Sequence, residues 1–371
     1  MKNVIIIGGG LAGLISAILL RREGFEVVLF EQKKYPFHRV CGEYISNEVV
    51  PFLNHHKLFP LALNPTNISQ FQLTSVTGKS LEMPLDLGGF GISRKSFDSW
   101  LASKAGDEGV VVINDRIVEC LFDKDQFNLK SKRGDSFVSD LVIGAFGKRS
   151  TLDKSLQRSF IDRRSPYVGV KYHIKTDAIE NNKIALHNFK KGYCGLSAVE
   201  NETYNLCYLT NRSNLKSSGS IPEMEHEVLK KNPFLNHVFT NSDFLFEKPE
   251  VINEISFEKK EPVFNHILMT GDSAGMIAPL CGNGMAMAIH SAKMLSELII
   301  ENQKAGFDRK KLELEYASLW NQNFAKRLST GRFIQKLFGS PLVSEITVQT
   351  GKSFKPFANY LMKKTHGQPF S

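Results

Sequence analysis

Hydrophobic side chains at the start of the chain follow the pattern of a strand, a helix and a second strand. Residues 4–7 are a continuous run of branched aliphatic residues, which is typical of a parallel strand covered on both faces. The next segment, which reaches Gly24, has apolar residues at helical spacing, and residues 27–30 form another apolar run. This order predicts a β-α-β unit and therefore a parallel sheet.

Later segments show two further patterns. Residues 65–87 and 167–209 alternate between apolar and polar positions, which predicts strands of an antiparallel sheet, while residues 110–113 and 117–118 return the chain to the first domain. Residues 312–338 carry apolar side chains every three or four positions, which predicts helices. The predicted fold class is α/β: a Rossmann-type domain with a parallel sheet (residues 1–65, 88–160 and 255–305), an inserted α+β substrate domain built on an antiparallel sheet (residues 66–87 and 161–254), and a basic helical C-terminal region (residues 306–371).

A glycine-rich turn separates the first strand from the first helix. The spacing GxGxxG falls on Gly8, Gly10 and Gly13, which permits a tight turn, close approach of a pyrophosphate and close packing of helix on strand. Glu31 ends the second strand, eighteen residues after Gly13, where an acid accepts hydrogen bonds from an adenosine ribose. Such an acid favours a free 2′-hydroxyl, so the segment predicts FAD or NAD rather than NADP. The predicted contacts are Gly8, Gly10, Leu11, Ala12, Gly13, Glu31 and Gln32.

A distant segment points to one of these dinucleotides. Residues 269–285 read MTGDSAGMIAPLCGNGM and resemble the GD motif of FAD-dependent oxidoreductases with the p-hydroxybenzoate hydroxylase fold, a class that includes geranylgeranyl reductases and flavin-dependent halogenases. The resemblance implies FAD, with Asp272 on its ribityl chain and the backbone of residues 282–285 at the flavin pyrimidine. A helix N-terminus there would stabilise negative charge on the reduced ring. The implied contacts are Gly271, Asp272, Gly282, Asn283, Gly284 and Met285.

Two more segments carry the resemblance, in the family's order along the chain. Residues 93–101 look like the family's RxxFDxxL element, in which the position of Arg94 reaches the cofactor, and residues 140–150 look like its DG motif. The candidate cofactor contacts also include Arg39 and the backbone of Val118, the latter against adenine.

The sequence departs from the family pattern in ways that bear on chemistry. Phe146 stands where the DG motif normally has an aspartate implicated in FAD and NADPH contacts, so the reductant is left open between NAD(P)H and a protein electron donor. The halogenase motif GWxWxIP is absent, and residues 192–198 occupy the corresponding stretch, which argues against halogenation. No cysteine follows Cys281, whereas quinone-linked electron-transfer flavoprotein dehydrogenases would need a cysteine cluster there.

Cys41 is the candidate catalytic residue. Residues 39–43 read RVCGE and resemble the Cys-Gly signature of geranylgeranyl reductases, in which the cysteine lies close to the flavin; here Glu43 replaces a second glycine. A thiol near the flavin could donate a proton to a substrate carbanion after hydride transfer. The alternative is a small, half-buried apolar side chain. Tyr193 and Leu196 are candidate substrate contacts, with ordinary sheet core as the alternative.

Charge and composition limit the other classes of function. The 371-residue chain has a net charge of +9, and residues 302–371 hold twelve basic against four acidic residues. This end is either a solvated helical face or a surface for anionic lipid; no nucleic-acid motif accompanies it. Five widely spaced cysteines and scattered histidines predict neither a disulfide framework nor a metal site. With no signal peptide or membrane span predicted, we expect a cytoplasmic protein with possible peripheral membrane contact.

The leading hypothesis is an FAD-dependent oxidoreductase that transfers a hydride to a carbon–carbon double bond of an isoprenoid- or polyene-like substrate. The first alternative is an FAD-dependent monooxygenase of an aromatic or lipid-like substrate. The second is a flavin-binding electron carrier without catalysis. The oligomeric state stays open.

Overall fold

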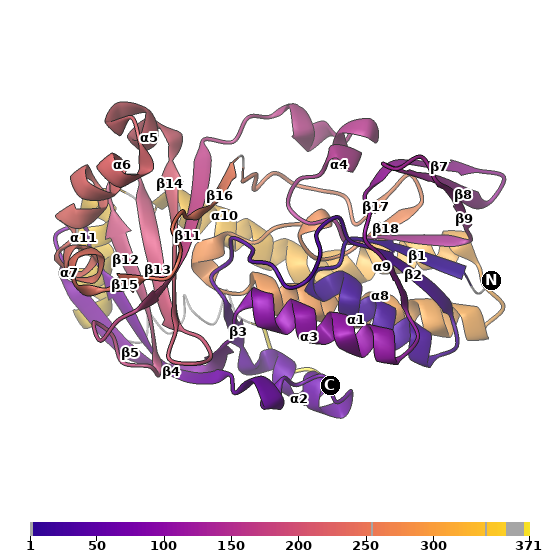
Figure 1. The fold of residues 1–371 in the computed structure, drawn as a ribbon, viewed down its shortest axis with the longest axis horizontal. Helices are drawn as coiled ribbons and strands as arrows, with labels where there is room; N and C mark the ends of the chain where they lie inside the picture. Colours follow the sequence, from indigo (N-terminus) through magenta and orange to yellow (C-terminus); the bar gives the residue numbers. More distant parts are fainter. Residues whose placement is uncertain (1–2, 254, 338–339, 354–366) are drawn as a thin grey trace.

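The protein consists of two lobes that lie side by side (Figure 1). The computed structural model describes residues 3–253, 255–337, 340–353 and 367–371. One lobe is built around a parallel sheet with helices on it, and the other around a larger, mainly antiparallel sheet. The predicted α/β fold with two kinds of sheet is therefore confirmed.

The first lobe contains the parallel sheet that the N-terminal pattern predicts. β1 (Asn3–Ile7) lies at its centre and pairs in parallel with β2 (Glu26–Phe30) and β10 (Leu141–Gly144). The sheet continues outward through β6 (Val111–Ile113) on one side, and through β18 (Ile267–Met269) and the antiparallel β17 (Val263–Phe264) on the other. Since β1, β2, β10 and β18 run in the same direction, their carboxyl ends meet at one edge of the sheet.

Helices cover this sheet because their apolar faces are buried against it. α1 (Leu11–Arg22) packs on α8 (Gly284–Lys304), and α3 (Arg94–Asp107) lies beside α1 (Figure 1). A small antiparallel sheet, made of β7 (Ile117–Asp123), β8 (Gln126–Ser131) and β9 (Ser136–Ser139), flanks the lobe. The short helices α2 (Val50–His55) and α4 (Thr151–Ser155) connect its elements.

The second lobe brings together strands from segments that are distant in sequence. Among the described residues its sheet has the order β15 (Asp243–Phe244), β11 (Tyr167–Lys175), β14 (Tyr204–Asn211), β13 (Gly192–Ala198), β12 (Lys183–Phe189), β4 (Thr66–Thr74), β5 (Ser80–Gly91) and β3 (Tyr44–Ser46), with β16 (Glu250–Asn253) also on β11. All these pairs are antiparallel except that of β4 with β12. The helices of this lobe are α5 (Arg212–Ser218), α6 (Ile221–Glu227) and α7 (Pro233–Asn241).

The C-terminal helices bridge the lobes. α9 (Arg309–Trp320) continues through a π-helical turn into α10 (Lys326–Leu337), and α11 (Pro341–Ser353) contacts β4 and β5. The apolar side chains of Leu312, Tyr316, Phe324 and Leu328 are buried in the core of the first lobe, so this part of the predicted stripe packs inward. Residues 338 and 339, and residues 354–366 of the basic end, lie outside the described residues. No helix in the described part of the chain is long and apolar enough to cross a membrane.

Candidate active site

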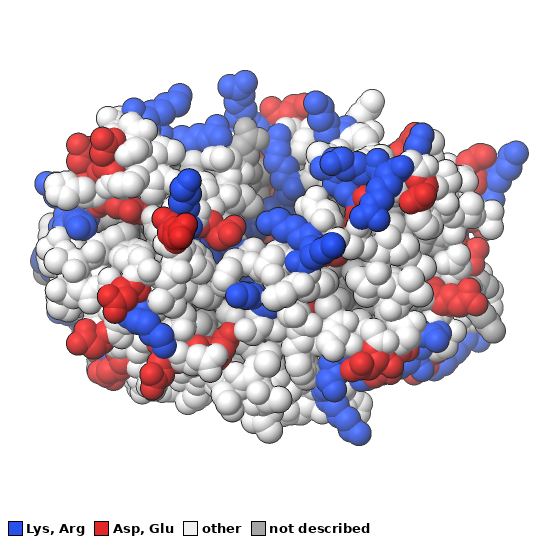
Figure 2. Space-filling view, viewed as in Figure 1, with Lys and Arg blue, Asp and Glu red and all other residues white. Residues whose placement is uncertain are grey.

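A large cavity runs between the lobes at the carboxyl edge of the parallel strands. Its volume is about 720 Å³, within the range of roughly 300–1,000 Å³ that is usual for small-molecule and cofactor sites. The cavity begins at the glycine-rich turn after β1 and reaches the strands β4, β5 and β12 of the second lobe. Figure 2 shows Lys and Arg side chains gathered around the hollow at the centre of one face.

The glycine-rich turn is shaped to receive an anion. Gly8 has a φ of +112°, and a Cβ there would lie 2.3 Å from the Ala145 carbonyl oxygen. A Cβ on Gly13 would lie 2.0 Å from the Gly8 oxygen, so both positions require glycine. No side chain caps the N-terminus of α1, whose first amides therefore remain available to a ligand. This uncapped helix start at a glycine turn fits the diphosphate of a dinucleotide.

Charged side chains beside the turn form one network. Glu31, directly after β2, accepts hydrogen bonds from the Gly9 amide (3.1 Å) and the Arg39 guanidinium (2.8 Å). Asp98 accepts from both Arg39 (2.9 Å) and Arg94 (2.7 Å), and it is almost fully buried. Two guanidinium groups are thus held at the turn by one carboxylate. Asp98 is a functional candidate that we did not single out from the sequence, although it lies within the RxxFDxxL element.

A second part of the site is made by the turn after β18 and the start of α8. Gly271 and Gly282 have positive φ angles of 59° and 65°, and the half-buried Asp272 lines the cavity. Asn283 lies behind the wall, where its side-chain amide donates to the buried carboxylate of Glu48 (3.3 Å). Glu48 also accepts hydrogen bonds from Arg327 and from the backbone of Gly367, so it anchors this loop to the C-terminal segment.

The loop that carries Cys41 is held by side chains from three other elements. Cys41 is half-buried and lines the cavity. The three successive carbonyl oxygens of Arg39, Val40 and Cys41 accept hydrogen bonds from Lys171 Nζ (3.2 Å), Lys148 Nζ (3.1 Å) and Asn205 Nδ2 (3.1 Å) respectively. The backbone is thereby fixed where the thiol meets the cavity. Burial opposes the charge on Arg94, but Asp98 and then Cys41 raise the pKa of its guanidinium.

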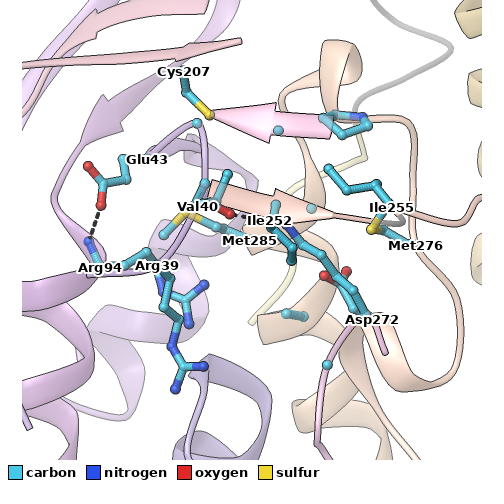
Figure 3. A pocket seen from close by; sticks show the side chains of 18 of the residues that line it. Arg39, Val40, Glu43, Arg94, Cys207, Ile252, Ile255, Asp272, Met276 and Met285 are labelled. Carbon is cyan, nitrogen blue, oxygen red and sulfur yellow. Dashed lines mark hydrogen bonds between the residues drawn. The ribbon is translucent and has the colours of Figure 1, made fainter. Parts of the chain in front are cut away.

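Glu43 is the centre of a buried charge cluster next to this loop. Its carboxylate accepts hydrogen bonds from the Arg94 amide (2.7 Å), from Lys171 and from His173 Nε2 (2.7 Å), as Figure 3 shows for Arg94. Glu43 and Lys171 are fully buried. Burial alone would raise the pKa of Glu43, but Lys171 and His173 lower it to about 2. Glu43 has a φ of 55°, a conformation that glycine adopts without strain, which explains why a glycine also suits this position.

Most of the predicted site residues lie on the cavity wall, and three do not. Gly13 packs behind the turn, Asn283 contacts Glu48, and Val118 follows Ile117, which does line the cavity. The cavity wall includes Gly8, Gly10, Leu11, Ala12, Glu31, Gln32, Arg39, Cys41, Arg94, Tyr193, Leu196, Gly271, Asp272, Gly282, Gly284 and Met285. Figure 3 shows Glu43 and Arg94 on one side of this space and Asp272 on the other, with Cys207 pointing in from its strand.

The end of the cavity in the second lobe is apolar. Its walls there include Leu73, Leu81, Met83, Leu85, Ile184 and Leu186 from β4, β5 and β12. Ile334 of α10 and Thr347 and Gly351 of α11 close it from the other side. We call this part of the cavity the apolar arm. Within the described chain no group of His, Cys, Asp and Glu is arranged to hold a metal ion.

Comparison with known proteins identifies the fold. Residues 6–58 match the model of the NAD(P)-binding Rossmann-like domain. The chain is 24% identical to the digeranylgeranylglycerophospholipid reductase of Methanosarcina acetivorans, over 91% of this chain and 84% of the relative. Among solved structures, the flavin-dependent brominase Bmp2 has a TM-score of 0.79 at 16% identity, covering 98% of this chain and 93% of that one. The halogenase PltM in complex with phloroglucinol and FAD has a TM-score of 0.78 at 15% identity, covering 98% and 82%.

These likenesses and the site define the class of the protein: the chain has the fold of the FAD-dependent oxidoreductases. The fold prediction made from the glycine turn and the GD-like segment is thus confirmed. The relatives include both a reductase and halogenases, so the class contains more than one chemistry.

Proposed function

We propose that the protein is an FAD-dependent oxidoreductase that reduces a carbon–carbon double bond of an extended hydrophobic substrate. The observation that carries the proposal is that one continuous cavity joins the dinucleotide turn to the apolar arm. A cofactor at the turn and a hydrophobic molecule in the arm would meet between the lobes, beside Cys41 and Met285.

FAD is supported by the fit of the described residues. The uncapped start of α1 and the guanidinium groups of Arg39 and Arg94 suit the diphosphate, and the carboxylates of Glu31 and Asp272 suit hydroxyl groups of ribose and ribityl. The halogenase PltM binds FAD within the same fold. When bound, FAD supplies the hydride; the protein has to hold substrate, exclude water and deliver a proton.

The nature of the substrate is supported by the apolar arm. The six side chains from β4, β5 and β12 named above are all uncharged and apolar, and Tyr193 and Leu196 of β13 extend that wall toward the flavin site. An alkyl or polyene chain can be desolvated there without leaving a polar group unpaired. The reductase relative is named for a lipid substrate, which agrees with this chemistry.

Cys41 is our candidate for the proton donor. Once a hydride had been supplied to one carbon of the double bond, the other carbon would need a proton; the Cys41 thiol would donate it and would regain a proton from solvent. The guanidinium of Arg94 interacts with Cys41 and would help to hold its sulfur at this position. The three hydrogen bonds to the carbonyls of residues 39–41 keep the thiol in place.

The second candidate function is oxygen-dependent chemistry on a similar substrate, as in a monooxygenase. It is favoured by the likeness in fold to a brominase and to a halogenase. Halogenation itself finds no support in the sequence, because residues 192–198 in β13, the stretch that corresponds to GWxWxIP, lack that motif. The position of Phe146 on the cavity wall leaves the reductant open between NAD(P)H and a protein donor.

The test compares products with and without oxygen. Purified protein reduced with dithionite is incubated with polyprenols, carotenoid precursors and phenols, and products are analysed by mass spectrometry. We expect a product that has gained two hydrogen atoms under strict exclusion of oxygen, and its loss in Cys41→Ala, with Cys207→Ala as a matched control. A product that requires oxygen and has gained an oxygen atom would replace the reductase proposal by the monooxygenase. Failure to bind FAD would refute both.

We also propose that the C-terminal helices contact a membrane surface at the outer end of the arm. Phe333, Leu342 and Ile346 expose 64%, 73% and 58% of their surface. Phe333 and Ile346 each adjoin a residue that lines the arm, and Leu342 lies in the same helix as Ile346. The basic residues of this region suit anionic lipid. In a flotation assay, the wild type should float with anionic vesicles, whereas the double variant Phe333→Ser/Leu342→Ser should stay behind. Equal flotation of the two proteins would exclude this surface.

A further inference from the structure

A lysine lies buried behind two of the turns that line the cavity. Lys260 is 4% exposed and precedes β17 in the chain. Its Nζ donates hydrogen bonds to the carbonyl oxygens of Lys148 and Asp272, both at 2.7 Å. Lys148 belongs to the turn after β10 and Asp272 to the turn after β18, and both residues line the cavity. One ammonium group therefore joins two turns that come from different strands.

A second buried cation reinforces the same place. Arg158 is fully buried and donates to the carbonyl oxygen of Ser273 (2.9 Å), the residue after Asp272. It pairs with Asp153 (3.1 Å), which is fully buried, and reaches Glu261, whose side chain is 47% exposed. Two buried cations thus share one fully buried carboxylate. Both acceptors of Lys260 are neutral carbonyls, so neither of these two hydrogen bonds pairs its ammonium with a carboxylate.

The groups that face Lys260 leave it easily titrated. Burial lowers the pKa of its ammonium to about 8; Asp153 and Asp272 oppose this change, while Arg158 and Lys148 add to it. The ring of Phe160 lies 4.4 Å from Nζ and completes the apolar surroundings. An additional negative charge in front of the turns would act on this lysine through little solvent, where electrostatic effects are strong.

We propose that Lys260 is a positioning residue that couples FAD binding to proton uptake. The diphosphate would lie at the glycine-rich turn after β1, which packs against the turn after β10, so its negative charge favours the protonated lysine behind that turn. The inference rests on the proposed FAD site. By linkage, protonation of Lys260 raises the affinity for FAD by the same factor by which bound FAD raises the proton affinity of Lys260.

The sign of the pH dependence follows from this coupling. Below about pH 8 Lys260 is protonated with or without FAD, so the affinity for FAD is constant. Above about pH 8 the free protein loses the proton and must recover it on binding, so the affinity falls. We expect FAD to bind roughly five- to tenfold more weakly at about pH 9 than at about pH 7.

The experiment is calorimetric titration of deflavinated, full-length protein with FAD. Titrations at about pH 8.5 in two buffers with different ionisation enthalpies give the number of protons taken up. We expect a clear fraction of one proton for the wild type and none for Lys260→Met, which should also bind FAD more weakly at about pH 7. Lys260→Arg keeps the charge at all these pH values, so it should take up no proton and keep its affinity at about pH 9.

A matched control is Lys183→Met. Lys183 is another buried lysine, but it lies in β12, pairs with Glu82 (3.1 Å) and is absent from the cavity wall, so wild-type proton uptake should persist. FAD binding without proton uptake in the wild type, or with undiminished uptake in Lys260→Met, would overturn the coupling alone. Absence of FAD binding at every pH would overturn the proposed function and the coupling together.

Discussion

Replacing Glu43 by Gln tests whether the buried charge cluster stabilises the loop of Cys41. The substitution keeps the shape of the side chain but leaves the ammonium of Lys171 in a fully buried site without its counter-charge. Removing one partner of a buried ion pair generally costs about 3–5 kcal/mol. The pKa of Glu43 gives a second figure for this free energy. Its fall from 4.5 to about 2 means that the fold stabilises the charged carboxylate by about 3 kcal/mol. The two figures agree, so we expect a loss of about 3 kcal/mol in the free energy of unfolding at neutral pH.

The assay is urea unfolding of the wild type and Glu43→Gln as a function of pH. A carboxylate with a lowered pKa contributes stability above its unfolded pKa and loses that contribution as the pH falls toward its folded pKa. The difference between the two proteins should therefore be complete above about pH 5 and shrink between pH 4.5 and about 2. Adding Lys171→Met should restore most of the stability, since no charge is then left unpaired.

Glu108→Gln is the matched control. Glu108 forms an ion pair with Arg22 at 2.7 Å, but both side chains are about one-third exposed, so its loss should change stability by less than about 1 kcal/mol. A difference for Glu43→Gln as small as this, or one that does not vary with pH, would refute the reasoning. So would a double variant less stable than Glu43→Gln itself.

Three further predictions concern other parts of the site. Asp98→Asn should release Arg39 and Arg94 and so weaken FAD binding. Since hydrogen bonds to charged groups are worth about 1.5–3 kcal/mol, we expect a loss of about ten- to hundredfold in affinity, measured by fluorescence titration. Unchanged affinity would contradict this role of Asp98. Leu186→Trp should fill the apolar arm and lower kcat/KM for long but not for short substrates. Leu121→Trp, on the exposed face of β7, should change kcat/KM for neither. An equal effect of Leu186→Trp on long and short substrates would contradict the proposal that the arm binds the substrate chain. Phe370→Ala should lower the unfolding free energy by about 1–3 kcal/mol, because its ring stacks on His290 at 4.1 Å, and an unchanged Tm would show that the C-terminal segment contributes nothing.

The parts of the fold that the sequence predicts are those encoded by neighbouring residues. The apolar run of β1, the glycine turn and the acid after β2 lie within the first 31 residues, and each has a local physical requirement. The strands of the second sheet are also predictable from alternation. Their order is not: β4 pairs with β12, whose residues lie more than a hundred positions later, and no local pattern specifies that partner.

The charge clusters show the same limit. The sequence marks Glu43 only as a departure from a glycine, because Lys171 and His173 reach it from a strand about 130 positions away. Lys260 carries no signal in its own segment, since its two acceptors are backbone carbonyls of turns elsewhere. The amphipathic stripe of the C-terminal helices predicts helices correctly. It does not distinguish the side chains that enter the core, such as Tyr316, from those near the arm, such as Ile334.

The buried charges of this site have a common physical origin in the backbone that they contact. Turns that present amides to an anionic ligand leave their carbonyl groups facing the protein interior, where each needs a donor. Here Lys260 and Arg158 donate to carbonyls of the turn after β18, and Lys171 and Lys148 donate to carbonyls of the Cys41 loop; a cation is a stronger donor than a neutral group. The same cations add positive charge behind the place where a diphosphate would lie. Stability of the turns and affinity for an anion are therefore coupled properties, and a variant that alters one should alter the other.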